Sequence, residues 1–217
     1  MNGKTRTAIL ISGRGSNMQA LVDATRADDF PAEIVLVLSN RPEAPGLAWA
    51  ASHGLATLAI DHKAYASREA FEAALQQALD TAKIELVALA GFMRLMTPGF
   101  VERWRDRMIN IHPSLLPSFK GLHTHERALA AGVKISGCSV HFVRAETDTG
   151  PIIAQAAVPV LPDDTPESLA TRVLAAEHTI YPIALKLVAS GRAHCEGENV
   201  VIPQHVTGDQ VLLSPSL

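Results

Sequence analysis

Asn110 and His112 stand two positions apart in the segment 108–113, which reads Met-Ile-Asn-Ile-His-Pro. Alternate side chains of a strand point to the same face, so the two polar groups would face one way and the isoleucines the other. An amide donor beside an imidazole suits acyl chemistry, because both groups can hold a carbonyl oxygen as it becomes an oxyanion and the histidine can also move protons. We therefore predict that Asn110 and His112 are catalytic.

A carboxylate, Asp148, lies in the polar segment 144–150, and Gly150-Pro151 imposes a sharp turn directly after it. The turn fixes the direction of Asp148, whereas Glu146 in the same segment is expected to be solvated. A carboxylate near His112 would favour the imidazolium and order a water between the two groups. The sequence raises this contact as a hypothesis.

The segment 12–17, Ser-Gly-Arg-Gly-Ser-Asn, follows an apolar run and opens a predicted helix. Free N–H groups at a helix start favour an anion, and glycines let the backbone approach it closely. Met18 takes the place of the third glycine of a dinucleotide fingerprint, and no Gly-Lys-Ser/Thr follows, so a P-loop is excluded. The segment predicts a site for one terminal phosphate, with a tight capped turn as the alternative.

Four histidines need separate weighing. His123 and His125 could be imagined with His112 and His141 as a metal cluster, but no strand, helix or carboxylate pattern supports it, and we predict no metal site. The residues around Gly121 are typical of a mobile loop over 118–125. His141 alternates with other strand positions and is either a site-lining or a hydrogen-bonded core histidine.

The first half of the chain predicts a mostly parallel, doubly wound sheet. Short apolar runs separated by amphipathic segments are typical of buried strands with helices on both faces. The predicted strands are 7–12, 34–40, 55–60, 86–90 and 108–112, and the predicted helices are 16–26, 44–52, 67–83 and 98–104. The segment 91–96 then lies at the ligand-binding edge, where its Met and Leu could line a flat apolar pocket or simply pack in the core.

The second half predicts an antiparallel hairpin over 133–143 and 152–160, followed by a long helix. Thr165 is its expected N-cap, Pro166 its first residue, and Ser190-Gly191 its end. A small hairpin is expected over 194–196 and 200–202, and the tail from about residue 203 has no assignment. We see no repeat or linker and expect one domain over 1–217.

The composition is that of a globular protein, with 217 residues, 47% hydrophobic, 19% charged and a net charge of −3. A nucleic-acid-binding protein would normally carry a surplus of basic residues, which this chain lacks. No apolar stretch is long enough to span a membrane. The first residues lead into a strand-like run rather than a signal peptide. We expect a cytoplasmic protein.

The blocks 110–117 (NIHPSLLP), 137–143 (GCSVHFV) and 148–153 (DTGPII) together resemble the folate-dependent formyltransferases. The opening block 11–20 (ISGRGSNMQA) resembles the branch of that family whose loop grips the phosphate of glycinamide ribonucleotide. The resemblance covers about residues 6–192. It implies an α/β fold of about seven strands, one of them antiparallel.

The resemblance also implies roles for individual residues, with 10-formyltetrahydrofolate as co-substrate, no metal, and a monomer or homodimer that binds neither nucleic acid nor membrane. Asn110, His112 and Asp148 match the catalytic trio. Residues that match the ribonucleotide site are Gly15, Ser16, Asn17 and Glu177. Residues that match the folate site are Arg68, Met93, Arg94, Leu95, Met96, Asn110, Arg144, Ala145, Glu146, Thr147 and Asp148. Leu174 departs from the family, which carries a Gln that touches the acceptor.

The expected reaction moves a formyl group to the amine of glycinamide ribonucleotide in purine biosynthesis. Two other functions stay open. One is a hydrolase that releases formate from the same donor, although water needs neither the phosphate loop nor Glu177. The other is a non-catalytic phosphometabolite-binding module, which has no use for Asn110, His112 and Asp148 together.

Overall fold

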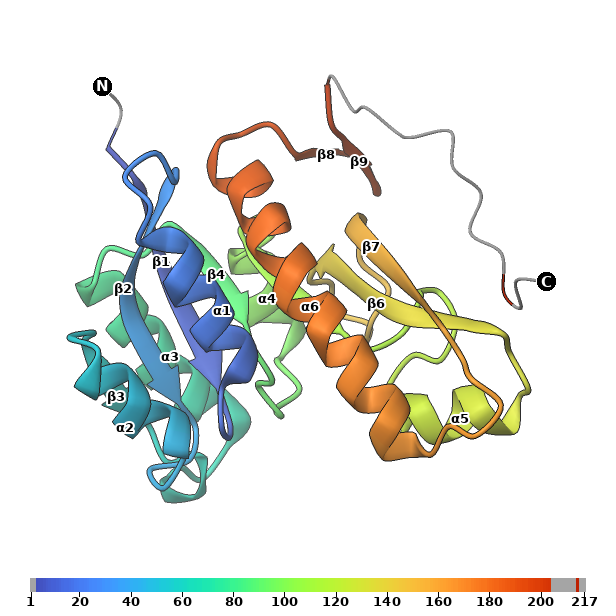
Figure 1. The fold of residues 1–217 in the computed structure, drawn as a ribbon. Helices are drawn as coiled ribbons and strands as arrows, with labels where there is room; N and C mark the ends of the chain where they lie inside the picture. Colours follow the sequence, from blue (N-terminus) through green and yellow to red (C-terminus); the bar gives the residue numbers. More distant parts are fainter. Residues whose placement is uncertain (1–2, 204–213, 215–217) are drawn as a thin grey trace.

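A computed structural model describes residues 3–203 and Ser214. A seven-stranded sheet, in the order β3-β2-β1-β4-β5-β6-β7, forms the centre of the molecule (Figure 1). Strands β1 to β5 pair in parallel, and β6 is antiparallel to both of its neighbours. The prediction of a mostly parallel sheet with one antiparallel strand is confirmed. Its strands are β1 Thr5–Ile11, β2 Ala32–Ser39, β3 Thr57–Ala59, β4 Leu86–Leu89, β5 Met108–His112, β6 Ile135–Phe142 and β7 Ile152–Pro159.

Helices cover both faces of the sheet (Figure 1). They are α1 Ser16–Thr25, α2 Pro45–Ser52, α3 Arg68–Thr81, α4 Pro98–Arg103, α5 Thr124–Ala130 and α6 Pro166–Ala189, with a short 3-10 helix over His62–Ala64. Alternation along β1 explains the two cores, because Ile9 and Ile11 pack with α1 and α6 while Ala8 and Leu10 pack with α3 and α4. None of the described helices is long and apolar enough to cross a membrane.

Helix α6 follows the predicted start. The Thr165 side chain accepts from the Ser168 N–H, the Ser168 side chain bonds back to the Thr165 N–H, and Pro166 is the first helical residue. The hydroxyl of Tyr181, fully buried in the middle of this helix, donates to the Leu89 carbonyl at 2.9 Å. The same hydroxyl lies 3.3 Å from the Ile109 carbonyl oxygen, so Tyr181 ties α6 to β4 and β5, while the helix also packs against β6 and β7.

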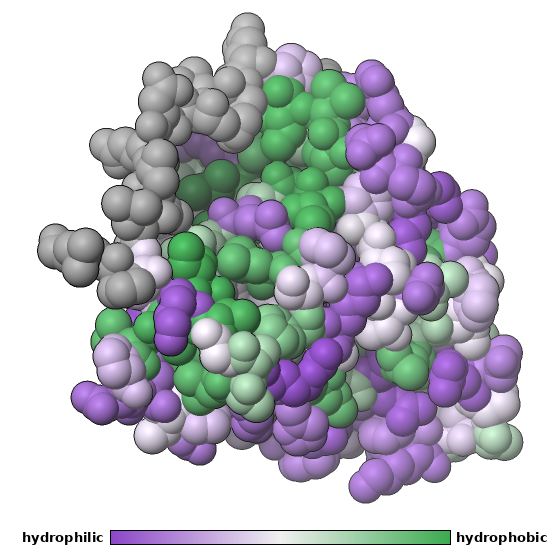
Figure 2. All heavy atoms as spheres, turned by 90° about the vertical axis from the view of Figure 1, so that its right-hand side faces the viewer, coloured by the Kyte–Doolittle hydropathy of each residue, from purple (hydrophilic) through white to green (hydrophobic). Residues whose placement is uncertain are grey.

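The C-terminal strands β8 (His194–Glu196) and β9 (Asn199–Val201) form the predicted small hairpin around Gly197, and β9 contacts the edge strand β7. Figure 2 views the β7 side of the molecule, where apolar surface gathers in the upper half. The described chain supplies Val200 and Ile202 to the core from this side. The unassigned tail lies outside the described residues, apart from Pro203 and Ser214.

One expectation for the secondary structure is wrong. The segment 118–125 was expected to be a loop throughout, but helix α5 begins at Thr124 and runs to Ala130. Its N-cap, His123, has a left-handed backbone with φ of 57°, and Thr124 is buried. The loop proper therefore ends at His123, because the buried Thr124 and Ala128 give the next segment a helical core face.

Candidate active site

Strand β5 places Asn110 and His112 on one face at its carboxyl end, as the alternation predicted. The ring of His112 is buried and Asn110 is half-buried. The antiparallel strand β6 sets His141 opposite Asn110 in the register. His141, on the antiparallel strand β6, is therefore the third polar side chain beside Asn110 and His112.

Asp148 reaches the same point from the loop between β6 and β7. Its Oδ2 lies 3.3 Å from Nδ1 of His112, and its side chain is 10% exposed. Asp148 has a positive φ of 52°, in the left-handed region that aspartate tolerates better than most residues. A Cβ on Gly150 would lie 1.7 Å from the Phe142 carbonyl oxygen, so only glycine fits the turn that follows. The hypothesised contact between Asp148 and His112 is present.

Both ring nitrogens of His112 face hydrogen-bond acceptors. Nδ1 faces the Asp148 carboxylate, and Nε2 lies 3.0 Å from the carbonyl oxygen of Phe119. A neutral imidazole can donate to only one acceptor, whereas the imidazolium donates to both. Each ring nitrogen of His112 therefore has a hydrogen-bond acceptor within reach. The Gly121 N–H also donates to Oδ2 of Asp148 at 2.8 Å, so the loop before α5 contacts the pair of Asp148 and His112.

His141 lines the site rather than only filling the core. Its Nδ1 lies 2.8 Å from the Phe142 carbonyl oxygen and its Nε2 lies 3.2 Å from Nδ2 of Asn110. Burial lowers the pKa of His141, so the ring is neutral near pH 7. With Nδ1 donating to the carbonyl, Nε2 is left to accept from the Asn110 amide. His141 thereby orients Asn110 and leaves its second amide hydrogen free for a ligand.

The loop before α1 follows β1, which β4 separates from β5 in the sheet. Gly15 has a φ of 72°, and the first helical hydrogen bond runs from the Gln19 N–H to the Gly15 carbonyl at 2.9 Å. The N–H groups at the start of the helix, Ser16 among them, are left without helical partners, which is the arrangement that binds anions.

The side chain of Asn17 contacts helix α6 rather than only the loop before α1. Its Nδ2 donates to Oε2 of Glu177 on α6 at 2.7 Å, and both residues are buried. Burial raises the pKa of Glu177, and the hydrogen bond from Asn17 opposes that shift. Among the described residues no group bonds Oδ1 of Asn17. The two residues form one polar unit beside the loop, with an acceptor to spare.

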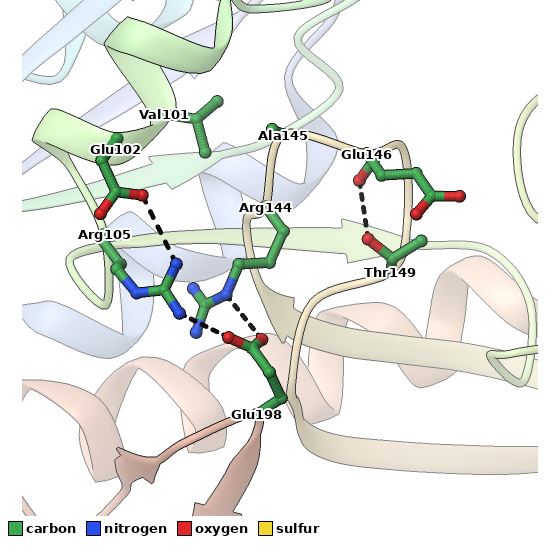
Figure 3. Close-up of a pocket in the computed structure, with 8 residues that line it drawn as sticks. All are labelled: Val101, Glu102, Arg105, Arg144, Ala145, Glu146, Thr149 and Glu198. Atoms are coloured by element: carbon green, nitrogen blue, oxygen red, sulfur yellow. Dashed lines mark hydrogen bonds and ion pairs between the residues drawn. The ribbon is translucent and has the colours of Figure 1, made fainter.

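A cavity of about 430 Å³ lies beside the loop 144–149 (Figure 3). Three of the residues expected at the folate site, Arg144, Ala145 and Glu146, line it. The other expected residues, Arg68, Met93–Met96, Asn110, Thr147 and Asp148, do not. The remaining lining residues, all missed by the sequence reasoning, are Val101, Glu102, Arg105, Thr149 and Glu198.

The segment 93–96 is held at both ends by side chains. The Met93 N–H donates to Oγ of Ser12 at 2.7 Å, and the Thr97 N–H donates to the buried carboxylate of Glu72 at 2.6 Å. Between these anchors, the side chains of Met93 and Leu95 are 63% and 62% exposed. Glu72 was missed, although its position three residues before Leu75 on the buried face of α3 is a signal that could have found it.

The outlying members of the predicted set lie apart from this cluster. Arg68 is exposed at the start of α3, and Leu174 is half-buried on α6, one turn before Glu177. His123 is exposed, 3.4 Å from Glu126, and burial lowers the pKa of His125. Over residues 3–203, no group of three or more His, Cys, Asp or Glu side chains is arranged to hold a metal ion.

Comparison with known proteins identifies the family. The sequence pattern described as "Formyl transferase" matches residues 5–185. The chain belongs to the formyl transferase family. A phosphoribosylglycinamide formyltransferase of Escherichia coli (strain K12) is 45% identical over 85% of this chain and 87% of its own length.

A solved structure, glycinamide ribonucleotide transformylase 1 from Symbiobacterium toebii, is 48% identical in sequence to this chain. The two structures superpose with a TM-score of 0.90, over 93% of this chain and 95% of that one. The trifunctional purine biosynthetic protein adenosine-3 of Drosophila melanogaster is 52% identical over 88% of this chain, which spans only 14% of that protein. A formyltetrahydrofolate deformylase from Burkholderia mallei is also similar, at 31% identity and a TM-score of 0.83 over 93% of this chain and 71% of its own.

Proposed function

We propose that this chain transfers the formyl group of 10-formyltetrahydrofolate to the amine of glycinamide ribonucleotide, giving N-formylglycinamide ribonucleotide and tetrahydrofolate. One observation carries the proposal: a histidine held by Asp148, beside an oriented Asn110, between an anion-binding loop and a cavity. Similarity at 45–48% identity to full-length proteins named for this reaction supports the choice of substrates.

In the proposed mechanism, the acceptor amine attacks the formyl carbon and the carbonyl oxygen becomes an oxyanion. The free amide hydrogen of Asn110 and the His112 imidazolium would each stabilise that oxygen by about 3 kcal/mol. Asp148 would hold His112 in its charged form. The intermediate then collapses by breaking the bond to the folate nitrogen, while a proton passes from the attacking amine to that nitrogen. No metal and no covalent enzyme intermediate takes part.

His112 would donate to the substrate through Nε2, because Asp148 occupies Nδ1. Nε2 now faces the Phe119 carbonyl, so the reaction needs that carbonyl to give way to the substrate oxygen. This exchange of one acceptor for another would keep the ring hydrogen-bonded throughout and exclude water from it.

For the acceptor, we propose that Gly15, Ser16 and Asn17 bind the phosphate and that Glu177 binds the sugar or amine end. The unused Oδ1 of Asn17 and the poorly compensated Glu177 carboxylate both fit hydroxyl or ammonium donors. Leu174, one turn away, offers no polar contact to this ligand.

For the donor, we propose that the cavity beside the loop 144–148 and the segment 93–96 receive the folate, with Arg68 near its carboxylates. Met93 and Leu95 present apolar surface on which a heteroaromatic ring can lie. We also propose that residues 1–217 act as one catalytic domain, as a monomer or homodimer in the cytoplasm.

A deformylase is the second candidate, since a protein of that name shares this fold and the chain's sequence at 31% identity. The discriminating experiment follows tetrahydrofolate release from 10-formyltetrahydrofolate with and without glycinamide ribonucleotide. Release that requires the ribonucleotide supports the transferase, and equal release without it supports the deformylase. A melting-temperature rise with ribonucleotide and no release either way would leave only a binding module.

A further inference from the structure

The small hairpin β8–β9 contributes to the donor-side cavity although it lies beyond the part of the chain that matches the family, which ends at residue 185. Glu198, in the turn of this hairpin, is one of the cavity's lining residues (Figure 3). It lies 54 positions after Arg144, which begins the loop 144–150 on another wall of the cavity. The C-terminal hairpin therefore supplies a wall of the cavity from beyond the residues that the family pattern matches.

Glu198 binds two arginines at once. One carboxylate oxygen lies 2.8 Å from Nε of Arg144, and the other accepts from Arg105, which follows α4 (Figure 3). Arg144 is also held by Asp106, whose Oδ1 is 2.8 Å from Nη2. The side chain of Arg144 is only 10% exposed, so its guanidinium depends on these carboxylates for the hydrogen bonds that water would otherwise supply.

The pKa shifts of Arg144 and Glu198 are those expected for a close ion pair. Burial acts to lower the pKa of Arg144, but the hydrogen bonds that Arg144 donates to Glu198 and Asp106 outweigh it and the pKa is raised. The same contact with Arg144 lowers the pKa of Glu198. Both groups thus stay charged at neutral pH.

Arg144 is the first residue of the loop that carries Asp148, four positions later. Its other guanidinium nitrogen, Nη1, donates to the carbonyl of Val143 just before it. The Arg144 side chain is bonded to Asp106 in the segment after α4, to Glu198 in the hairpin and to the Val143 carbonyl, and it thereby holds the start of the loop where it leaves β6. The position of Asp148 and the cavity wall both follow from that departure point.

We propose that Glu198 is a positioning residue: through Arg144 and Arg105 it fixes the start of the catalytic-aspartate loop and closes one wall of the donor site. The proposal rests on the function proposed above. It assigns a role in donor binding to a hairpin that lies outside the family's matched region.

The test compares Glu198→Ala and Glu198→Gln with Glu196→Gln as a matched control. Glu196 lies on the same hairpin and pairs with His194 at 3.6 Å, but it does not line the cavity. We expect Glu198→Ala to raise the KM for 10-formyltetrahydrofolate about fivefold, the scale of one good exposed ion pair, with the KM for the ribonucleotide within about twofold of the parent. Glu198→Gln keeps an acceptor oxygen, so its KM for 10-formyltetrahydrofolate should lie between those of the parent and Glu198→Ala. Both KM values of Glu196→Gln should match the parent's.

Amide hydrogen exchange supplies a readout that does not depend on activity. We expect Glu198→Ala to speed exchange in the loop 144–150 and to leave the loop 13–17 unchanged. Unchanged exchange and an unchanged donor KM would overturn the proposal, as would an equal rise in both KM values with a lower melting temperature. If the parent transfers no formyl group, the proposed function fails, while exchange in 144–150 still decides whether Glu198 fixes the loop.

Discussion

Replacing Asp148 by Asn tests the electrostatic part of the mechanism, because asparagine keeps the size of the side chain and removes its charge. The amide oxygen can still accept from the Gly121 N–H, so the loop over the site keeps that contact. What is lost is the attraction between the carboxylate and the His112 imidazolium. The two closest atoms are 3.3 Å apart in surroundings that leave Asp148 10% exposed.

The size of the effect follows from Coulomb's law. Charges delocalised over both groups are centred about 5 Å apart, and at an effective dielectric constant of about 20 they attract by about 3 kcal/mol. The rate should fall on the order of 10²-fold if that energy is needed in the transition state. We expect kcat to fall by this factor, while KM for each substrate stays within about threefold.

The assay is steady-state release of tetrahydrofolate under saturating concentrations of both substrates. Asp163→Asn, which neutralises an exposed aspartate in the turn after β7, is the control and is expected to match the parent. Circular dichroism verifies that both variants are folded. If kcat of Asp148→Asn lies within about threefold of the parent, the charge of Asp148 is not used in the reaction and this reasoning is refuted.

Three further variants probe the supports of the site. His141→Phe removes the acceptor that orients the Asn110 amide, so kcat should fall about tenfold at unchanged KM in the same assay; an unaffected kcat would remove His141 from the account. Tyr181→Phe loses a buried hydroxyl donor to the β4 carbonyl, and urea unfolding should show a loss of about 1–2 kcal/mol with activity retained; equal stability would contradict this. The hydrogen bond from Arg172 is the main contact that holds the pKa of Asp164 below its usual range, so the carboxylate stabilises the fold above the unfolded-chain pKa of about 4 and this stability is lost as pH falls. The melting temperature of Asp164→Asn should therefore lie below the parent's at pH 7 and approach it below about pH 4, and a gap that persists in acid would contradict the linkage.

Local patterns were sufficient to predict most of the fold. Alternation in 108–112 put Asn110 and His112 on one face, and the Thr165-Pro166 pair marked the start of α6, since both signals depend only on near neighbours. The helix α5 was missed because Gly121 and Thr124 are typical of a loop, while the burial of Thr124 and Ala128 that stabilises the helix comes from distant partners.

Contacts between distant residues could not be predicted in the same way. His112 and Asp148 are 36 positions apart, and Arg144 and Glu198 are 54 apart, so their meeting depends on where β6 reverses and where the final hairpin folds back. Charge and turn chemistry suggested the first pair. Nothing near Glu198 in the sequence marks it, because an exposed glutamate in a hairpin turn is an ordinary feature.

The most direct test of direct formyl transfer follows the formyl carbon itself. The protein is incubated with glycinamide ribonucleotide and 10-formyltetrahydrofolate that carries an isotope label in the formyl group, and the products are separated and identified by mass. We predict that the label appears in the formylated ribonucleotide in a one-to-one ratio with tetrahydrofolate, and that His112→Ala abolishes both products together. Label recovered as formate, at a rate independent of the ribonucleotide, would contradict the account.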